Sequence, residues 1–301
     1  MKNIVVVGSL NLDTVIEVPQ MPKAGETLAG TGVSQVPGGK GANQAYAIGK
    51  LLGNVKMIGA VGNDAPGKIL VDNLESVGVD ISGISEIKGG TTGQAFITVE
   101  DSGENSIIII AGTNADVTQD LIQNNMDAIQ EADIIIMQLE IPLETVEYVK
   151  DVAVKYGKTV ILDPAPAVAG LPDSFWKGID YIKPNETELS ILVGSPLEDM
   201  EEIREGARSM LQKGVKNVLV TLGSEGCLFV TEETEEYYPA CKVEAVDTTA
   251  AGDSFTAAFA LALSRGKSCG EAIQFGQKVS SIAVTRKGAQ TSIPSPEEVV
   301  G

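Results

Sequence analysis

The sequence of 301 residues contains no histidine. This absence excludes Ser-His-Asp and Cys-His catalysis, histidine-ligated metals and the H-E-x-x-H metalloproteases. Any acid–base chemistry therefore falls to carboxylates or lysines.

Positive charge is also scarce. The chain has 22 lysines and arginines against 41 aspartates and glutamates, which leaves a net charge of −19. Such an acidic protein lacks the basic surface that binds nucleic acid, so we expect no DNA or RNA partner. A phosphorylated ligand can bind only where backbone N–H groups or a cation overcome the negative field.

Cysteines and long apolar runs are few. Cys227, Cys241 and Cys269 are odd in number and show no C-x-x-C spacing, which argues against a disulfide framework and a zinc site and favours free thiols. No apolar run approaches the roughly 20 residues that span a bilayer, so no membrane role is expected. The first residues, MKNIVVVGSL, have the pattern of a strand rather than of a signal peptide, and we expect a cytoplasmic protein.

Short apolar runs alternate with helical patterns from about residue 130 onward. The runs NIVVVG, DIIIMQ, TVILD and NVLVTL are almost wholly apolar, as is typical of parallel strands covered on both faces. The pattern predicts an α/β fold with a doubly wound, mostly parallel central sheet flanked by helices.

Two early regions, 14–35 and 91–110, carry turn signals and partial alternation, which predict antiparallel hairpins. We expect a single domain over 1–301 in which about 12–36 and 90–111 form a small β-sheet lid. The run SIIII, 106–110, is apolar on both faces and therefore predicts a partner surface, such as a homodimer formed through the lid sheets.

Polar segments follow several strands of the predicted central sheet. Ligands of open α/β sheets bind beyond the carboxyl ends of the strands, so these segments indicate one shared crevice. Each acid or asparagine taken singly could also be an ordinary loop residue or the start of a helix. The segments contain Asn11 and Asp13, Glu140, Asp163, 184–188 and 222–226.

The segment PGGKGANQAYAIGKLLG, 37–53, resembles a phosphate-binding P-loop, but Ser34 and Gly41 occupy positions where that motif needs glycine and Ser or Thr. It instead offers a glycine-rich entry into a helix, with Lys40 and Asn43 placed to bind a polyhydroxyl ligand; a purely structural turn is the alternative. The first strand is followed by Gly8 alone and not by G-x-G-x-x-G, so a dinucleotide site for hydride transfer is not expected.

The segment DTTAAGDSFTAAFA, 247–260, places one acid at the start of an apolar helix. Free N–H groups of residues 250–253 at a helix N-terminus would form an anion hole, and Gly252 would allow close approach of a phosphoryl group. Asp253 beside it could accept a proton from an attacking hydroxyl. The alternative is an acid that merely stabilises the helix start.

These residues resemble the ribokinase group of the PfkB carbohydrate-kinase family along the full length of the chain. The resemblance is carried by GSLNLD, GGKGANQA, QLE, DPAPA, PNETE, TLGSEG, DTTAAGD and TRKGAQTSIP. It implies ATP-dependent phosphorylation of D-ribose at the 5-hydroxyl, giving D-ribose 5-phosphate and ADP, with Asp253 as the base beside Ala250, Ala251 and Gly252. It implies that the sugar contacts Asn11, Asp13, Gly39, Lys40, Gly41, Asn43, Glu140 and Asp253.

The resemblance also implies ATP, Mg²⁺ and a monovalent cation, usually K⁺. The implied nucleotide contacts are Asn185, Glu188, Thr221, Gly223, Ser224, Gly226, Gly252 and Gln277, with Glu188 organising Mg²⁺ through water. The implied monovalent-cation positions are Asp247, Thr249, Ala283, Arg286, Gly288 and Ser292.

Two positions depart from the family pattern. Ala250 stands where the broader family usually has glycine, so the backbone there must be open to an L-residue. Asp163 stands where ribokinases often have asparagine, and we expect a structural role for it.

Other functions remain as alternatives. A related kinase could act on deoxyribose, fructose or a nucleoside such as adenosine. A phosphorylated sugar fits less well, because residues 10–40 offer only Lys23 and Lys40. A sugar-binding regulator without turnover is disfavoured because Asp253, Gly252 and Asn185 are all present.

Overall fold

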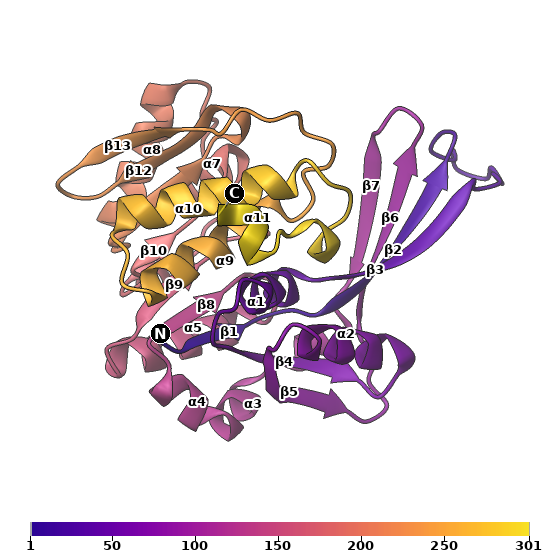
Figure 1. Ribbon diagram of the computed structural model, residues 1–301, viewed down its shortest axis with the longest axis horizontal. Coiled ribbons are helices and arrows are strands. Elements are labelled where there is room, and N and C mark those ends of the chain that lie inside the picture. The colour runs from indigo at the N-terminus through magenta and orange to yellow at the C-terminus, as the bar shows by residue number, and fades with distance from the viewer. Residues whose placement is uncertain (1, 301) are drawn as a thin grey trace.

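The first strand, β1 (Ile4–Val7), is an interior strand of the larger sheet and is buried on both faces. Ile4 and Val6 belong to one hydrophobic core, whereas Val5 and Val7 belong to a second. Because alternate residues of a strand point to opposite faces, the two cores lie on opposite sides of the sheet. The computed structural model describes residues 2–300 (Figure 1).

The central sheet has nine strands, of which the first seven in chain order pair in parallel and the last two are antiparallel. In spatial order these are β13 (Glu235–Pro239), β12 (Gly226–Val230), β11 (Asn217–Thr221), β10 (Tyr181–Ile182), β9 (Thr159–Leu162), β8 (Ile134–Met137), β1, β4 (Val55–Gly62) and β5 (Asp80–Ile87). This arrangement confirms the predicted mostly parallel sheet.

Helices cover both faces of this sheet. The core that contains Ile4 also takes side chains from α1 (Lys40–Lys50), α2 (Ala65–Glu75), α9 (Ala251–Ser264), α10 (Cys269–Ala283) and α11 (Pro296–Val300). The core that contains Val5 takes side chains from α3 (Gln119–Asn124), α4 (Met126–Glu131), α5 (Leu143–Lys155), α6 (Asp173–Trp176), α7 (Glu186–Val193) and α8 (Met200–Gln212). Short 3₁₀ turns occur at Gly112–Asp116, Gly223–Glu225 and Gln290–Ser292.

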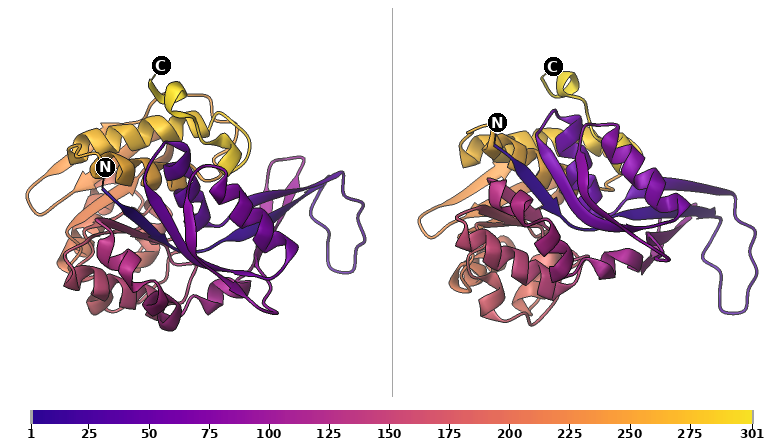
Figure 2. Two further views of the ribbon diagram at one scale, coloured as in Figure 1. Left: turned by 60° about the horizontal axis from the view of Figure 1, so that its bottom comes forward. Right: turned by 90° about the horizontal axis from the view of Figure 1, so that it is seen from below.

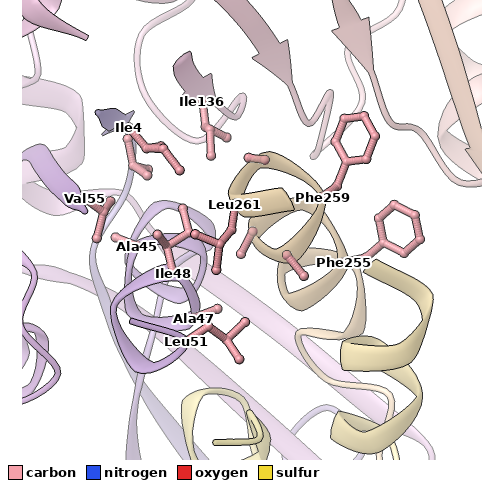
Figure 3. Close-up of a cluster of buried hydrophobic side chains, with 14 of the residues drawn as sticks. Ile4, Ala45, Ala47, Ile48, Leu51, Val55, Ile136, Phe255, Phe259 and Leu261 are labelled. Carbon is pink, nitrogen blue, oxygen red and sulfur yellow. The ribbon is translucent and has the colours of Figure 1, made fainter. Parts of the chain in front are cut away.

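Helix α9 is apolar nearly all round because it is buried between α1, α10 and the sheet. Figure 3 shows Ala45 and Ile48 of α1 beside Leu261 of α9, with Phe255 and Phe259 farther along α9. The rings of Phe255 and Phe259 stack at 6.5 Å between centroids. This packing holds α9 against α1.

A second, four-stranded sheet stands away from the main body (Figures 1 and 2). Its order is β3 (Gly32–Gly38), β2 (Asn11–Val18), β6 (Gly93–Glu100) and β7 (Asn105–Ile110). The pairs β2–β3 and β6–β7 are antiparallel, which confirms the two predicted hairpins, and β2 pairs with β6 in parallel. The division of the chain into a domain and a lid at about 12–36 and 90–111 stays a prediction.

Edge strand β7 exposes a row of apolar side chains. Ile107, Ile108, Ile109 and Ile110 are exposed by 53, 67, 55 and 48%.

Within residues 2–300 the three cysteines are free, as the sequence predicted, and no helix combines the length and apolar character needed to cross a membrane.

Candidate active site

The glycine-rich turn brings the start of α1 against the end of β1. Gly39 has a φ of 85°, and a Cβ there would lie 2.7 Å from the backbone nitrogen of Asn11. A Cβ on Gly41 would lie 2.7 Å from the carbonyl carbon of Gly8. Both positions therefore need glycine, because any side chain would push α1 away from the strand.

Polar groups gather at this turn. The backbone N–H of Lys40 donates a 3.1 Å hydrogen bond to Oε2 of Glu140, which also accepts from the hydroxyl of Ser9. Asn11 is 4% exposed, and its Oδ1 accepts a 2.7 Å hydrogen bond from Nδ2 of Asn114. The turn thus holds several of the predicted sugar-binding residues in one place.

Asp13 of β2 is an acid in an unfavourable environment. Its Oδ1 is buried and has no hydrogen-bond partner within the part of the chain that the structure describes. Burial, with the negative charges of Glu140 and Asp253, raises the pKa of Asp13 to about 7. A ligand hydroxyl that donates to this carboxylate would supply the hydrogen bond that its buried oxygen lacks.

Asp253 lies in the first turn of α9, is 5% exposed and is held by two amides from α1. Asn43 Nδ2 donates to its Oδ2 at 2.9 Å, and Gln44 Nε2 donates to its Oδ1 at 3.0 Å. Burial raises the pKa of Asp253, against the opposing charge of Lys40. A carboxylate with a raised pKa is a better proton acceptor, so the geometry suits general-base chemistry.

Lys40 supplies positive charge to the same region. Burial opposes its charged form, but the neighbouring acids, led by Asp253 and Asp163, outweigh this effect and raise the pKa of the ammonium above its usual value. Lys40 therefore stays protonated at neutral pH.

A buried network behind Asp253 was not foreseen from the sequence. Gln44 Nε2 bridges the two carboxylates, donating to Asp163 Oδ2 as well as to Asp253, both at 3.0 Å. Gln138 Nε2 donates to Gln44 Oε1 at 2.7 Å and so fixes the orientation of that amide. Asp163 and Asp253 thus share one hydrogen-bond donor, and the structural role expected of Asp163 stays a prediction.

A second support reaches Asn43 from the C-terminal region. Gln290 is 3% exposed, and its Nε2 donates to Asn43 Oδ1 at 3.1 Å. The Oε1 atom of Gln290 accepts from the side-chain amide of Asn73 in α2. Asn43 is therefore oriented by one contact while it holds Asp253 by another.

The start of α9 only partly matches the expected anion hole. Ala250 adopts the left-handed conformation, with a φ of 58°, so this position tolerates an L-residue as the sequence required. The N–H of Ala251 donates to the carbonyl of Thr248 at 3.2 Å, which corrects the expectation that all four amides of 250–253 are free. Among residues 2–300, the N–H groups of Ala250, Gly252 and Asp253 have no hydrogen-bond acceptor. The turn before α9 therefore engages the N–H of Ala251 and leaves the other three N–H groups of 250–253 able to bind an anion.

A cavity of about 700 Å³ opens at this helix start, a size usual for small-molecule sites. Seven of the eight predicted nucleotide contacts line it: Asn185, Thr221, Gly223, Ser224, Gly226, Gly252 and Gln277. The eighth, Glu188, lies beside it in α7, where its Oε2 accepts from the N–H of Asn185 at 2.8 Å while its own N–H donates to Asn185 Oδ1 at 2.7 Å. One carboxylate oxygen of Glu188 remains available.

The predicted monovalent-cation positions are brought together in part. Asp247 Oδ1 accepts from the N–H of Thr249 at 2.9 Å, and its Oδ2 accepts from the N–H of Gly288 at 2.8 Å. Arg286 instead pairs with Glu298 at 2.7 Å. Ala283 and Ser292 are both buried, and the hydroxyl of Ser292 donates to the carbonyl of Ala289 at 2.7 Å. The roles of all six residues stay predictions.

The donor set fits hard cations. Within residues 2–300, no cluster of three acidic or cysteine side chains could hold a metal ion. Mg²⁺ commonly binds through one or two carboxylates and the substrate phosphates, which fits Glu188 beside the cavity. Around Asp247, burial is outweighed by hydrogen bonds from Thr249 and Gly288, which lower the pKa of Asp247 and so favour its negative charge.

Sequence reasoning missed five polar side chains that the structure places here: Ser9, Gln44, Asn114, Gln138 and Lys183. Gln44 and Gln138 stand next to or inside the motifs GGKGANQA and QLE, and Lys183 ends the strand run YIK. Reading the last residue of each strand together with the segment that follows would have found Lys183. Asn114 lies in a 3₁₀ turn and carries no sequence signal.

Comparisons with known proteins agree with this geometry. A model of the pfkB family carbohydrate kinases matches residues 1–296. The chain is 40% identical over 299 residues to the ribokinase of Haemophilus influenzae, covering 99% of this chain and 97% of the relative. It is 38% identical over 296 residues to the deoxyribokinase of Salmonella typhimurium, covering 98% and 97%.

A solved structure shows the same fold. That of Arabidopsis thaliana ribokinase complexed with ribose and ATP matches with a TM-score of 0.93 at 36% identity, covering 99% of this chain and 97% of the other. The predicted fold and family are thereby confirmed. The chain belongs to the pfkB family of carbohydrate kinases.

Proposed function

We propose that this kinase transfers the γ-phosphoryl group of ATP to the 5-hydroxyl of D-ribose. One observation carries the proposal. Asp253 lies in the first turn of α9, where the neighbouring Gly252 lines the nucleotide-sized cavity, and its carboxylate is held by the helix that begins at Lys40. The acid therefore lies between the predicted nucleotide site and the predicted sugar site.

The reaction follows from this position. Asp253 accepts the proton of the sugar 5-hydroxyl while the 5-oxygen of the sugar bonds to the γ-phosphorus of ATP. The bond between the γ-phosphorus and the β–γ bridging oxygen breaks, which releases ADP. The free N–H groups of Gly252 and Asp253 donate to oxygens of the phosphoryl group in transfer. Ala250 shapes this turn through its left-handed backbone.

The sugar site is formed from groups that pair with hydroxyls. Carboxylates such as Asp13 and Glu140 accept from sugar hydroxyls, whereas Asn11, Asn43 and Lys40 can donate to them. Gly39 and Gly41 let the start of α1 pack against the backbone of 8–11, which brings Lys40 and Asn43 to the sugar site. Two acids near the site disfavour a substrate that already carries a phosphate, so we propose a free sugar.

ATP occupies the cavity lined by Asn185, Thr221 and Gln277 in this proposal. Glu188 would organise Mg²⁺ through water, and the ion would supply positive charge that offsets the phosphates. Asp247, Thr249 and backbone carbonyls of 283–292 would hold K⁺, which would order the loops that precede α9 and contain Gly288.

The two-sheet arrangement supports two further proposals. The small sheet acts as a lid over the sugar, and two copies of the chain pair through the apolar edge strand β7. The kinase acts in the cytoplasm, where ATP and free sugars meet.

The experiment is a substrate panel of ribose, 2-deoxyribose, fructose and adenosine with ATP and Mg²⁺, run in K⁺ and then in Na⁺. We expect the highest kcat/KM for ribose, higher activity in K⁺, and a product whose phosphate is attached at the 5-oxygen by ³¹P NMR. A preference for 2-deoxyribose would overturn the substrate but not the kinase reaction, and the deoxyribokinase relative makes this the outcome to test first.

A further inference from the structure

Lys183 is a buried lysine directly behind the start of α9. It follows β10, its N–H donates to the carbonyl of Leu162 at 3.1 Å, and it is 5% exposed. A Cβ built on Gly252 would lie 3.3 Å from Nζ of Lys183. The ammonium therefore lies beside the residue whose free amide lines the nucleotide cavity.

The ammonium of Lys183 is not saturated by the protein. Oδ1 of Asp163 lies 3.6 Å from Nζ, beyond hydrogen-bond distance, and has no hydrogen-bond partner. Across residues 2–300 the Lys183 side chain donates no hydrogen bond at all. An ammonium has three donors, and because no protein acceptor among the described residues takes those of Lys183, they are available to a ligand at the start of α9.

A second buried lysine shows how this fold satisfies an ammonium when the role is structural. Lys150 in α5 is 3% exposed, and its Nζ donates to the carbonyl of Ser174 at 3.2 Å and lies 2.8 Å from Oδ1 of Asp151. Two protein oxygens therefore contact the ammonium of Lys150 within 3.2 Å, whereas none in the described part of the chain does so for Lys183, which lies beside Gly252.

The charge of the site also calls for a cation at this point. Asp253, Asp163, Glu140 and Glu188 all act on Lys40 through their charges. Phosphate oxygens that approach α9 meet these acids, and Lys40 lies on the α1 side of the site. Lys183 is the lysine placed behind the amides.

We propose that Lys183 is a catalytic residue of the kinase reaction, whose ammonium donates a hydrogen bond to a non-bridging oxygen of the phosphoryl group during transfer, beside the N–H of Gly252. The inference rests on the proposed function. Asp163 is then the counter-ion that holds the ammonium in place, and Gln44 links that counter-ion to the catalytic base. The alternative is that Lys183 serves only to neutralise the buried charge of Asp163.

A double substitution distinguishes a role of Lys183 in phosphoryl transfer from a role in neutralising Asp163. Lys183→Met alone leaves Asp163 buried without a counter-charge and can unfold the protein. Lys183→Met combined with Asp163→Asn removes both charges, and the asparagine oxygen still accepts from Gln44. The reference is Asp163→Asn alone, and the control for burying methionine in place of lysine is Lys150→Met.

The measurements are kcat, KM for ATP and ribose, and calorimetric Kd values for ADP alone and for ADP with aluminium fluoride and ribose. Relative to Asp163→Asn, we expect the double variant to lose about 100- to 1,000-fold in kcat, the usual cost of one donor to a developing anion. We expect it to bind ADP within threefold of the reference and to lose most of the extra affinity for the aluminium fluoride complex. Lys150→Met keeps wild-type kcat.

A double variant with kcat and aluminium fluoride affinity within threefold of Asp163→Asn would overturn the proposal and assign Lys183 to charge neutralisation. Loss of ADP affinity equal to the loss in kcat would also overturn it, because the lysine would then act in ground-state binding. A wild-type protein that phosphorylates none of the four panel substrates contradicts the proposed function instead, and this outcome is seen before any substitution is made.

Discussion

Asn43 Nδ2 donates a 2.9 Å hydrogen bond to Oδ2 of Asp253, although 210 positions separate the two residues in the chain. The contact joins the first turn of α1 to the first turn of α9, and the apolar packing of these helices behind it keeps the two ends in register. The orientation of the predicted base is thus set by a helix that also carries predicted sugar contacts.

Replacing the base tests the reaction itself. Asp253→Asn keeps an oxygen that can accept a hydrogen bond but removes the proton acceptor. We expect kcat to fall about 100- to 10,000-fold, whereas the affinities for ribose and ATP stay within a few fold of the wild-type values. The variant should unfold near the wild-type temperature, because removing a buried charge offsets the loss of one of the two oxygens that accept from Asn43 and Gln44. Full activity in Asp253→Asn would remove the mechanism.

Asp13 predicts a pH-dependent stability. Its folded-state pKa of about 7 lies above the unfolded value of 3.8, so the folded protein binds the proton more tightly between these values. The free energy of unfolding from this group is therefore greatest below about pH 4 and is lost as the pH rises to about 7. We expect Asp13→Asn to raise stability at pH 8 by on the order of 1–3 kcal/mol, while the KM for ribose increases.

An acid with the opposite shift serves as the control. Burial of Asp64 is outweighed by hydrogen bonds from Thr92 and Gly67, which lower its pKa. Its contribution is present above pH 4 and is lost as the pH falls. Urea denaturation from pH 2 to 8 should therefore show a flatter profile between pH 4 and 7 for Asp13→Asn, and for Asp64→Asn a loss of stability at pH 7 that shrinks only as the pH falls below about 4. Equal pH profiles for Asp13→Asn and wild type would contradict the raised pKa.

The nucleotide loop depends on a glycine. Gly226 has a φ of 121°, and a Cβ there would lie 2.0 Å from the carbonyl oxygen of Tyr238 in the paired strand. Gly226→Ala should destabilise the protein by about 2–4 kcal/mol and raise the KM for ATP more than that for ribose. Gly223 has a φ of 53°, and no described atom lies within 4 Å of its Cβ position. Gly223→Ala should therefore lower the free energy of unfolding by only about 1 kcal/mol. Equal thermal shifts for the two variants would refute the steric argument.

The exposed strand predicts self-association. Ile108 of β7 is 67% exposed on an edge that has free hydrogen-bonding groups. Ile108→Asp should raise the Kd of a homodimer at least about tenfold in analytical ultracentrifugation, because it places a charge in an apolar contact. Val154→Asp, at a 47% exposed position of α5, should leave the mass unchanged. A monomeric wild-type protein would contradict the proposed pairing.

Much of the fold follows from local pattern. The almost wholly apolar runs of β1, β8, β9 and β11 are typical of strands covered on both faces and predicted the central sheet, and the glycines before Lys40 predicted the entry into α1. One side of the nucleotide cavity was also foreseeable, because Asn185, 221–226 and Gly252 follow strand ends or start a helix. Gln277, Ser280 and Ser281 line it from the later turns of α10, where no strand end points to them.

The polar network behind Asp253 was not foreseeable in the same way. Gln44 and Gln138 carry no periodic signal, and only the close approach of α1 to the sheet puts their amides in contact. The N–H of Ala251 was expected to be free because the sequence does not show that the preceding loop turns back through Thr248. Contacts between distant residues depend on tertiary packing, which local patterns do not encode.

The hydrogen bond from Gln290 to Asn43 has a consequence for protein synthesis. A chain emerging from the ribosome makes α1 early, yet Asn43 gains its orienting partner only near the end of translation. An incomplete chain that ends before Gln290 can already bury most of both cores without a correctly aimed base. Premature termination products should therefore resemble folded protein while turning over no sugar.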